Sequence, residues 1–239
     1  MSKPQKIGAF PHPHSQSKSK DRLLDAAVHV IRSKGYAATT VDDICHHAGV
    51  TKGSFFHHFK SKDDLALAAV AYWRAMTEAF FAAAPYRQPQ DPLARLLGYL
   101  DLRASILTGE LADYTCLLGT LVQEIYATHP DIRAACEAAL SSHIAALTRD
   151  LEAAKDLYAP GAPWSAEGVG AFIQAVLQGS FIFAKAEQSP QGVRDNLEHL
   201  RRYLRLLFNN TAGPGPLPEL KAAEEEVEEE EEAQRYFVD

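Results

Sequence analysis

The chain has 239 residues, of which 46% are hydrophobic and 23% charged, and its formal net charge is -7 at pH 7. This length suits one small module and one larger domain with a substantial apolar core. No run of about 18 apolar residues occurs, which argues against a membrane-spanning helix, and the N-terminus lacks the apolar segment of a signal peptide. The three cysteines follow no pairing pattern, so we expect a cytoplasmic protein without disulfides.

Charge is distributed unevenly along the chain. Ten Lys and Arg against four Asp give residues 1–62 a net charge of +6, whereas residues 219–239, with ten acidic and two basic side chains, carry -8. A basic segment neutralises phosphates, and its affinity for DNA should fall as the salt concentration rises. The sequence therefore predicts that only the N-terminal quarter contacts double-stranded DNA.

The first 19 residues form a basic arm that we expect to be disordered, because it contains Pro, Ser and Gln and few apolar residues. Such an arm can lie along DNA. It can equally be a solvated tail, and both interpretations stay open.

A pair of short helices joined by a tight turn is the most specific prediction from the sequence. The first helix of the pair is capped by Thr39 or Thr40 and ends at Gly49, which supplies the turn. The second helix is capped by Thr51. A preceding helix that ends at Gly35 completes a three-helix unit. Proteins use this arrangement to place one helix in the major groove of DNA.

The outer face of the helix predicted over residues 52–59 is expected to contact DNA. Lys52 and nearby hydroxyl groups can hold phosphates, whereas Ser54 and His57 can reach base edges. Phe55 and Phe59 are expected to point into the three-helix core. The residues predicted to bind DNA are Thr40, Thr51, Lys52, Ser54, Phe56, His57, Lys60 and Lys62.

A combination of fixed positions runs through this segment: Gly35–Tyr36, Thr39–Thr40, Ile44, Ala48–Gly49–Val50, Lys52–Gly53, Phe56, His58–Phe59 and Lys62. With these residues the segment resembles the DNA-binding domain of the TetR family of bacterial transcriptional regulators. The family pattern has a tyrosine where Phe56 stands, so the phosphate contact of that hydroxyl is absent here. The resemblance implies a repressor with an N-terminal helix-turn-helix domain, residues 20–62, and a larger helical domain for ligand binding and dimerisation, residues 63–210.

The composition of the larger domain also favours an all-α fold, because Ala and Leu dominate and few stretches have the alternation of a strand. Aromatic side chains at helical spacing suggest a core or a ligand cavity, but no group of polar residues identifies a ligand. Prolines and glycines delimit the predicted helices, which cover residues 61–84, 91–109, 111–129, 131–154, 165–187 and 190–208.

The last two predicted helices carry candidate residues for a homodimer interface. Ala171, Ala175 and Gly179 recur at four-residue spacing on the first, and an apolar stripe on the second consists of Val193, Leu197, Leu200, Leu204 and Leu207. Both stripes could instead serve the core of a single chain. The family resemblance favours a homodimer, whose recognition helices would meet successive major grooves of a near-palindromic operator.

Cys116 is a candidate sensor. The segments around Cys116 and Lys185 resemble the NemR- and AcuR-like subgroup of the family, in which a cysteine close to a lysine responds to an electrophile, an oxidant or a ligand. The resemblance implies a small-molecule or electrophile inducer sensed at Cys116, with Lys185 as its neighbour, because a nearby ammonium favours the reactive thiolate. The alternative is that Cys116 is a small apolar residue of the core.

Other kinds of site have weaker support. The spacing of Cys45, His46, His47, His57 and His58 matches no zinc ligand set, so no metal ion or cofactor is expected. Cys45 is expected at the surface and Cys136 in the core. Two alternative functions stay open: a DNA-binding adaptor whose helical domain binds a protein partner, and an enzyme whose site the sequence does not reveal.

The tail, residues 211–239, contains eight glutamates between positions 224 and 232. Like-charge repulsion makes disorder the expectation for this segment at neutral pH. The tail could compete with DNA for the basic module or simply increase solubility.

Overall fold

The computed structural model describes residues 18–209, and every regular element in that part of the chain is helical. The elements are α1 (Ser19–Lys34), α2 (Val41–Ala48), α3 (Lys52–His58), α4 (Lys62–Ala83), the 3-10 helix η1 (Pro85–Arg87), α5 (Pro92–Ser105), α6 (Leu111–Tyr114), α7 (Leu117–Ile125), α8 (Pro130–Tyr158), α9 (Ala166–Glu187) and α10 (Gln191–Asn209). The predicted all-α fold is confirmed. The acidic tail and nearly all of the basic arm lie outside the described residues.

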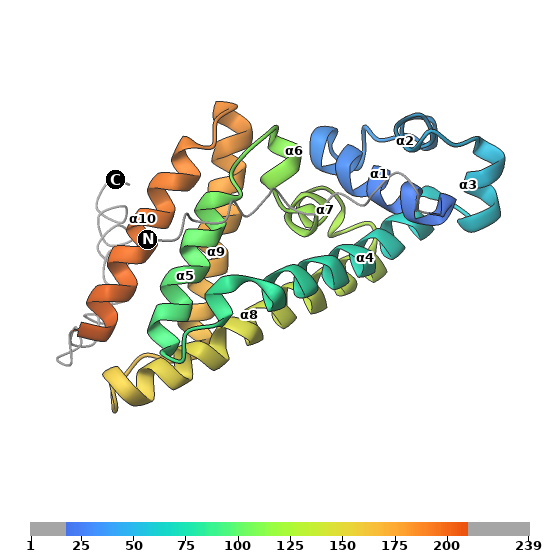
Figure 1. Ribbon diagram of the computed structural model, residues 1–239. Helices are drawn as coiled ribbons and strands as arrows, with labels where there is room; N and C mark the ends of the chain where they lie inside the picture. The colour runs from blue at the N-terminus through green and yellow to red at the C-terminus, as the bar shows by residue number, and fades with distance from the viewer. Residues whose placement is uncertain (1–17, 210–239) are drawn as a thin grey trace, which may run out of the picture.

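Helices α1 to α3 form a small head at one end of the molecule (Figure 1). The body consists of α4 to α10. Its two long helices, α4 and α8, pack against each other and run from the head to the far end, where α5, α9 and α10 pack on α8 and on one another. A shift of the long helices in the body would therefore also move the head.

The head has the caps and the turn that the sequence predicts. The Thr40 hydroxyl accepts a hydrogen bond from the Asp43 amide (3.1 Å), and the Asp43 carboxylate accepts one from the Thr40 amide (2.8 Å). Gly49 has a left-handed φ of 61°, and Arg22 donates to its carbonyl oxygen across 2.9 Å. The turn into α3 therefore needs glycine and is held from α1.

One predicted helix, over residues 111–129, is wrong. The chain instead forms α6 and α7, and Thr115 and Cys116 between them have extended backbone conformations. The Thr115 carbonyl oxygen accepts a hydrogen bond from Arg32 of α1 across 3.1 Å. A side chain from a distant helix therefore satisfies a backbone group at the break. Arg32 is 83 positions away in the chain, so local signals of helix formation cannot predict this hydrogen bond.

Two helix ends also differ from the prediction. Helix α5 ends at Ser105, four residues early, and Arg194 of α10 donates to the carbonyl oxygens of Ala104 (3.1 Å) and Leu107 (2.6 Å) at this end. Helix α8 continues to Tyr158, because the first residue after residue 154 that opposes a helix is Pro160.

Two clusters of buried apolar side chains fill the molecule. The first occupies the head and continues into α7 and the nearer halves of α4 and α8. The second lies between α5, α9, α10 and the farther parts of α4 and α8. Cys116 is half-buried and packs against both clusters. It therefore lies at the boundary between the two parts of the core.

Helices α9 and α10 differ in how they use their apolar residues. The predicted stripe on α10 is buried in the second cluster from Val193 to Leu204, so the alternative of a single-chain core is confirmed for it. On α9, Ala171 and Ala175 are exposed, and a Cβ added at Gly179 would meet nothing within 4 Å. The exposed large apolar side chains of these two helices are Phe172, Ile182 and Phe183 of α9 and Tyr203 and Leu206 of α10, and the rings of Phe172 and Tyr203 pack against each other.

By length and composition alone, α9 could cross a membrane. Core helices of water-soluble proteins often meet the same criterion, and α9 packs against α8 and α10 within the body.

Candidate DNA-binding surface and ligand pocket

Helix α3 exposes one face and buries the other. Phe56 is 57% exposed, and Lys52 and His57 are exposed beside it, whereas Phe55 and Phe59 are 0% and 3% exposed. The predicted burial of the two phenylalanines is confirmed. The exposed face of α3 therefore presents a cation, an imidazole and an aromatic ring to solvent.

The lysines beside this face form exposed ion pairs. Lys52 lies 2.8 Å from the Asp42 carboxylate, and Lys34 lies 2.6 Å from that of Asp43. The hydrogen bond from Lys34, followed by those from Thr40, holds the pKa of Asp43 well below its usual range. The bond to Asp42 raises the pKa of Lys52. Exposed pairs of this kind contribute little to stability, so Lys52 can exchange its partner for a phosphate.

Several predicted DNA-binding residues have structural partners of their own. Thr40 and Thr51 are the N-caps of α2 and α3. Lys62 donates to the carbonyl oxygens of Tyr36 and Thr39, each across 3.0 Å, and its ammonium lies 4.1 Å from the centre of the Tyr36 ring. Ser54 is half-buried and Lys60 is exposed. Contact between these residues and DNA stays a prediction.

Contacts between side chains and backbone join the head to the body. Arg32 of α1 is 4% exposed, donates to Thr115, and stacks on Trp73 of α4 with its guanidinium carbon 4.6 Å from the ring centre. Burial lowers the pKa of Arg32 to about 10. Glu124 of α7 accepts a hydrogen bond from the Ala37 amide, in the loop before α2, across 2.8 Å.

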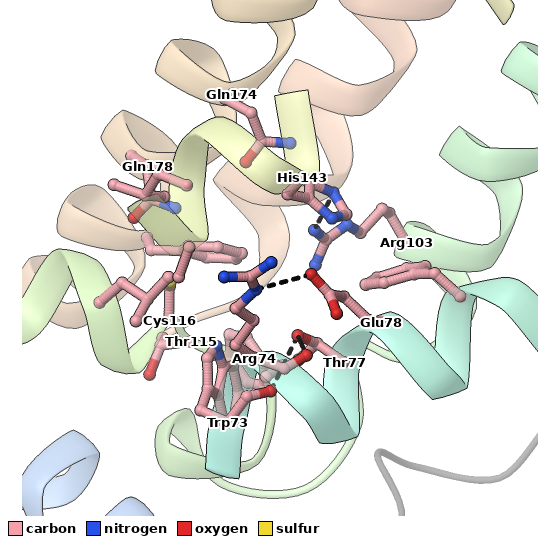
Figure 2. Close-up of a pocket in the computed structure, with 16 residues that line it drawn as sticks. Trp73, Arg74, Thr77, Glu78, Arg103, Thr115, Cys116, His143, Gln174 and Gln178 are labelled. Carbon is pink, nitrogen blue, oxygen red and sulfur yellow. Dashed lines mark hydrogen bonds and ion pairs between the residues drawn. The ribbon is translucent and has the colours of Figure 1, made fainter. Parts of the chain in front are cut away.

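A pocket lies in the body between α4, α5, the α6–α7 break, α8 and α9 (Figure 2). It contains about 550 Å³ of empty space, part of which is open to solvent. Apolar and aromatic side chains line it, and so do polar ones: Arg74, Thr77, Glu78, Arg103, Thr115, Cys116, His143, Gln174 and Gln178. This mixture of an apolar lining and a few polar groups is typical of small-molecule sites.

The two predicted sensor residues line one small recess beside this pocket. Cys116 and Lys185 both contribute to its wall, together with Thr120 and Gln178. The Lys185 ammonium donates to the Thr120 hydroxyl across 2.7 Å, and burial lowers the pKa of Lys185. The structure therefore brings both residues to one recess, while the sensor role of the pair stays a prediction.

A polar network in the pocket was missed by the sequence analysis. Arg103 Nε donates to the Tyr99 hydroxyl (2.9 Å), which also accepts from Gln174 (3.2 Å) and contacts His143 Nε2 (2.9 Å). Burial, and next the charge of Arg103, lowers the pKa of His143 to about 3. The residues come from α5, α8 and α9, so no local pattern joins them. The sequence offered one signal for such a network, which is a polar residue such as Gln174 on a helix face that is otherwise apolar.

Both the head and the body match known protein families. Residues 23–69 match the family described as bacterial regulatory proteins, tetR family, and residues 92–199 match the C-terminal domain of LmrA/YxaF-like transcriptional regulators. The transcriptional regulator AcuR of Cereibacter sphaeroides is 30% identical over 176 residues, which cover 70% of this chain and 77% of AcuR. The chain belongs to the TetR family of bacterial transcriptional regulators.

Solved structures support the same fold for this TetR-family protein. The regulatory protein TetR from Rhodobacter sphaeroides has 25% identity and a TM-score of 0.71, with 78% of this chain and 99% of that chain covered. Reduced NemR of E. coli has 20% identity and a TM-score of 0.66, with 77% and 96% covered. Helices α2 and α3 are therefore the helix-turn-helix of a transcriptional regulator, and the predicted resemblance to AcuR and NemR is confirmed.

The remaining cysteines of this TetR-family protein lie in the core. The prediction of a surface position for Cys45 is wrong: the side chain is 5% exposed, because it lies on the inner side of α2 with Ile44 and Ala48. Cys136 is fully buried as predicted, and burial raises the pKa of its thiol to about 12. Within residues 18–209, no group of three His, Cys, Asp or Glu side chains is placed to hold a metal ion.

Proposed function

We propose that this TetR-family regulator is a cytoplasmic repressor whose dimer binds a near-palindromic operator and leaves it when a small ligand, an electrophile or an oxidant acts at the pocket beside Cys116. One observation carries the proposal: Cys116 lines the pocket and packs against both parts of the core. A change at its sulfur atom therefore acts on the head and the body together.

The proposed DNA contacts follow from the exposed face of α3. Ser54 and His57 reach base edges, whereas Lys52, Lys60 and Lys62 bind phosphates. Phe56, which is exposed on the same face, packs against the sugar–phosphate backbone. Thr40 and Thr51 present their hydroxyl groups to phosphates at the N-termini of α2 and α3, where helix dipoles favour anions.

The exposed apolar face of α9 and α10 supports a homodimer. Phe183 is 58% exposed and Leu206 is 68% exposed, and small residues between the large ones allow a second pair of helices to approach closely. A two-fold axis at this face would produce a four-helix interface. The two heads would then meet successive major grooves, about 35 Å apart, on one side of the duplex.

The proposed switch uses the break between α6 and α7. Thr115 and Cys116 line the pocket, and the Thr115 carbonyl oxygen binds Arg32 of the head. Helix α7, which follows Cys116, holds the loop before α2 through Glu124. Displacement of this segment by a bound or covalently attached molecule would tilt the head relative to the body. A differential binding energy of only a few kcal/mol is enough to shift such an equilibrium.

To test the proposal, wild-type protein and Cys116→Ser are each bound to operator DNA and treated with N-ethylmaleimide, which alkylates thiols. The measurement is the fraction of protein that leaves the DNA. We expect the reagent to release wild-type protein and to leave Cys116→Ser bound. Cys45→Ser and Cys136→Ser are matched controls, because both thiols are buried, and they should respond as wild type does.

Release of Cys116→Ser at the wild-type rate would contradict the sensor role of Cys116. If no small electrophile or lipophile released the wild-type protein, an adaptor with a protein partner would be the better description.

A further inference from the structure

A second cavity, here called the outer cavity, opens between α4, η1 and α8, beside the pocket of Figure 2, here called the inner pocket. Its lining includes Ala82 of α4, Tyr86 of η1 and Ala146 of α8. The volume open to the centre of a water molecule is about 340 Å³ in the outer cavity but only about 40 Å³ in the inner pocket. The inner pocket therefore has room for a few water molecules, whereas the outer cavity can receive a small organic molecule.

The two cavities share part of their walls, because Glu78, Phe81 and His143 line both of them. The ring centres of Phe81 and His143 lie 5.0 Å apart. Arg103 lies 4.5 Å from the centre of the Phe81 ring, measured from its guanidinium carbon. The Tyr99 hydroxyl contacts His143 Nε2 across 2.9 Å. Both shared rings are therefore held in place, and Glu78 is the shared side chain that can move.

Glu78 belongs to a polar clasp that joins α4 to α8 and consists of Arg74, Glu78 and Ser142. Glu78 Oε1 accepts a hydrogen bond from Arg74 Nε (2.8 Å), which Figure 2 marks with a dashed line, and another from the Ser142 hydroxyl (2.7 Å). The side chains of Arg74 and Glu78 are 46% and 47% exposed. Because an exposed ion pair contributes little to stability, the clasp can open at a small cost in free energy.

We propose that small molecules reach Cys116 from the outer cavity, through a gate that opens when Glu78 separates from Ser142. The inner pocket extends from Arg74 and Glu78 on α4 to Cys116 at the break between α6 and α7, so a molecule that passes the clasp meets the sulfur atom in the same pocket. The inference rests on the proposed function in treating Cys116 as the point of action.

The recess beside Lys185 is the competing route to Cys116. It reaches the same sulfur atom and is lined by Gln123 at the surface of α7. Its volume open to the centre of a water molecule is about 10 Å³, which is at the limit for a single water. The outer cavity is therefore the favoured entrance.

The test measures how fast N-ethylmaleimide alkylates Cys116 in the full-length protein without DNA. The thiolate sulfur adds to the C=C bond of the reagent, the neighbouring carbon takes up a proton, and mass spectrometry of the peptide that contains Cys116 follows the reaction. Ala146→Trp fills the outer cavity and should slow alkylation roughly 10-fold or more, because the reagent must pass through this entrance. Ser142→Ala removes one hydrogen bond of the clasp and should speed alkylation about 2- to 10-fold.

Two further tryptophan variants serve as controls. Ala134→Trp changes an exposed residue of α8 outside both cavities and should react at the wild-type rate. Gln123→Trp blocks the recess and should also react at the wild-type rate. If Ala146→Trp fails to fold, as judged by circular dichroism, Ala82→Trp fills the same cavity from α4, and the Ser142→Ala comparison can refute the gate by itself.

Alkylation of Ala146→Trp at the wild-type rate would overturn the inference. So would an unchanged rate in Ser142→Ala, slowing by Gln123→Trp as large as that by Ala146→Trp, or no alkylation of Cys116 in the wild-type protein. None of these measurements involves DNA, so the repressor proposal is judged separately. Alkylation of Cys116 that leaves the operator complex intact would contradict that proposal and leave the entrance in place.

Discussion

Arg32 of α1 donates a hydrogen bond to the carbonyl oxygen of Thr115 across 3.1 Å, and this contact joins the helix-turn-helix head to the wall of the pocket in the body. The guanidinium is buried and also stacks on Trp73 of α4. One side chain of the head therefore contacts the pocket wall and the long connecting helix. The relationship makes α1, as well as α4, a route between the pocket and the DNA-binding surface.

Replacement of Arg32 by methionine should destabilise the protein. The apolar part of the side chain is retained, but the Thr115 carbonyl oxygen loses its hydrogen bond from Arg32 in a buried place. We expect the free energy of unfolding in urea to fall by about 1–3 kcal/mol. The same substitution at exposed Arg133 should change it by less than about 0.5 kcal/mol. Equal effects of the two substitutions would contradict a special role for Arg32.

Restoration of the tyrosine of the family pattern at position 56 should strengthen DNA binding. Phe56 is exposed on α3, so the added hydroxyl meets no obstacle in the free protein and can donate to a phosphate. One additional hydrogen bond is worth about 0.5–1.5 kcal/mol, which corresponds to a gain in affinity of roughly 2- to 10-fold. Fluorescence anisotropy with labelled operator DNA measures the affinities of wild type and Phe56→Tyr. Weaker binding by Phe56→Tyr would indicate that this ring does not face the backbone.

An arginine at position 183 should disrupt the dimer. Phe183 is 58% exposed in the single chain and lies on the apolar face of α9 and α10. Burial of an unpaired charge at an interface is strongly unfavourable. Light scattering after size-exclusion chromatography should therefore give a dimer mass for wild type and a monomer mass for Phe183→Arg. Tyr126→Arg, which changes an equally exposed aromatic residue at the end of α7, should remain dimeric.

Acid should destabilise the protein through His143. In the unfolded chain the imidazole has a pKa of about 6.5, but in the folded protein burial lowers it to about 3. As the pH falls below about 6.5, the unfolded state binds a proton that the folded state does not, so stability decreases toward pH 3.

A comparison with His143→Gln measures this contribution, because glutamine keeps an acceptor for Tyr99 and does not titrate. Between pH 7 and pH 5, wild type should lose on the order of 1 kcal/mol more stability than the variant. Parallel losses in the two proteins would mean that His143 is readily protonated in the folded state.

The parts of the fold that were predicted correctly depend on local chemistry. The cap at Thr40 and the turn at Gly49 each require a particular residue type within a few positions, so the sequence itself contains the information. The same holds for Phe55 and Phe59, whose spacing along a short helix distinguishes the inner face from the outer one.

The parts that were missed depend on residues far apart in the chain. The break at Thr115 is satisfied by Arg32, and the pocket network joins Tyr99 to His143 and Gln174 on other helices. The stripe on α10 posed a different difficulty. A core and a dimer interface have the same helical periodicity, so the pattern alone could not assign Leu200 or Leu204 to one of them.

The most direct measurement is the affinity of the purified protein for a fragment from upstream of its own gene, compared with random duplex of equal length at physiological salt. The paired basic heads should bind one promoter fragment roughly 10³-fold more tightly than random DNA, and the affinity should fall steeply as salt is added. Equal affinity for every fragment would show that the α3 face does not recognise sequence and would contradict assignment as an operator-binding repressor.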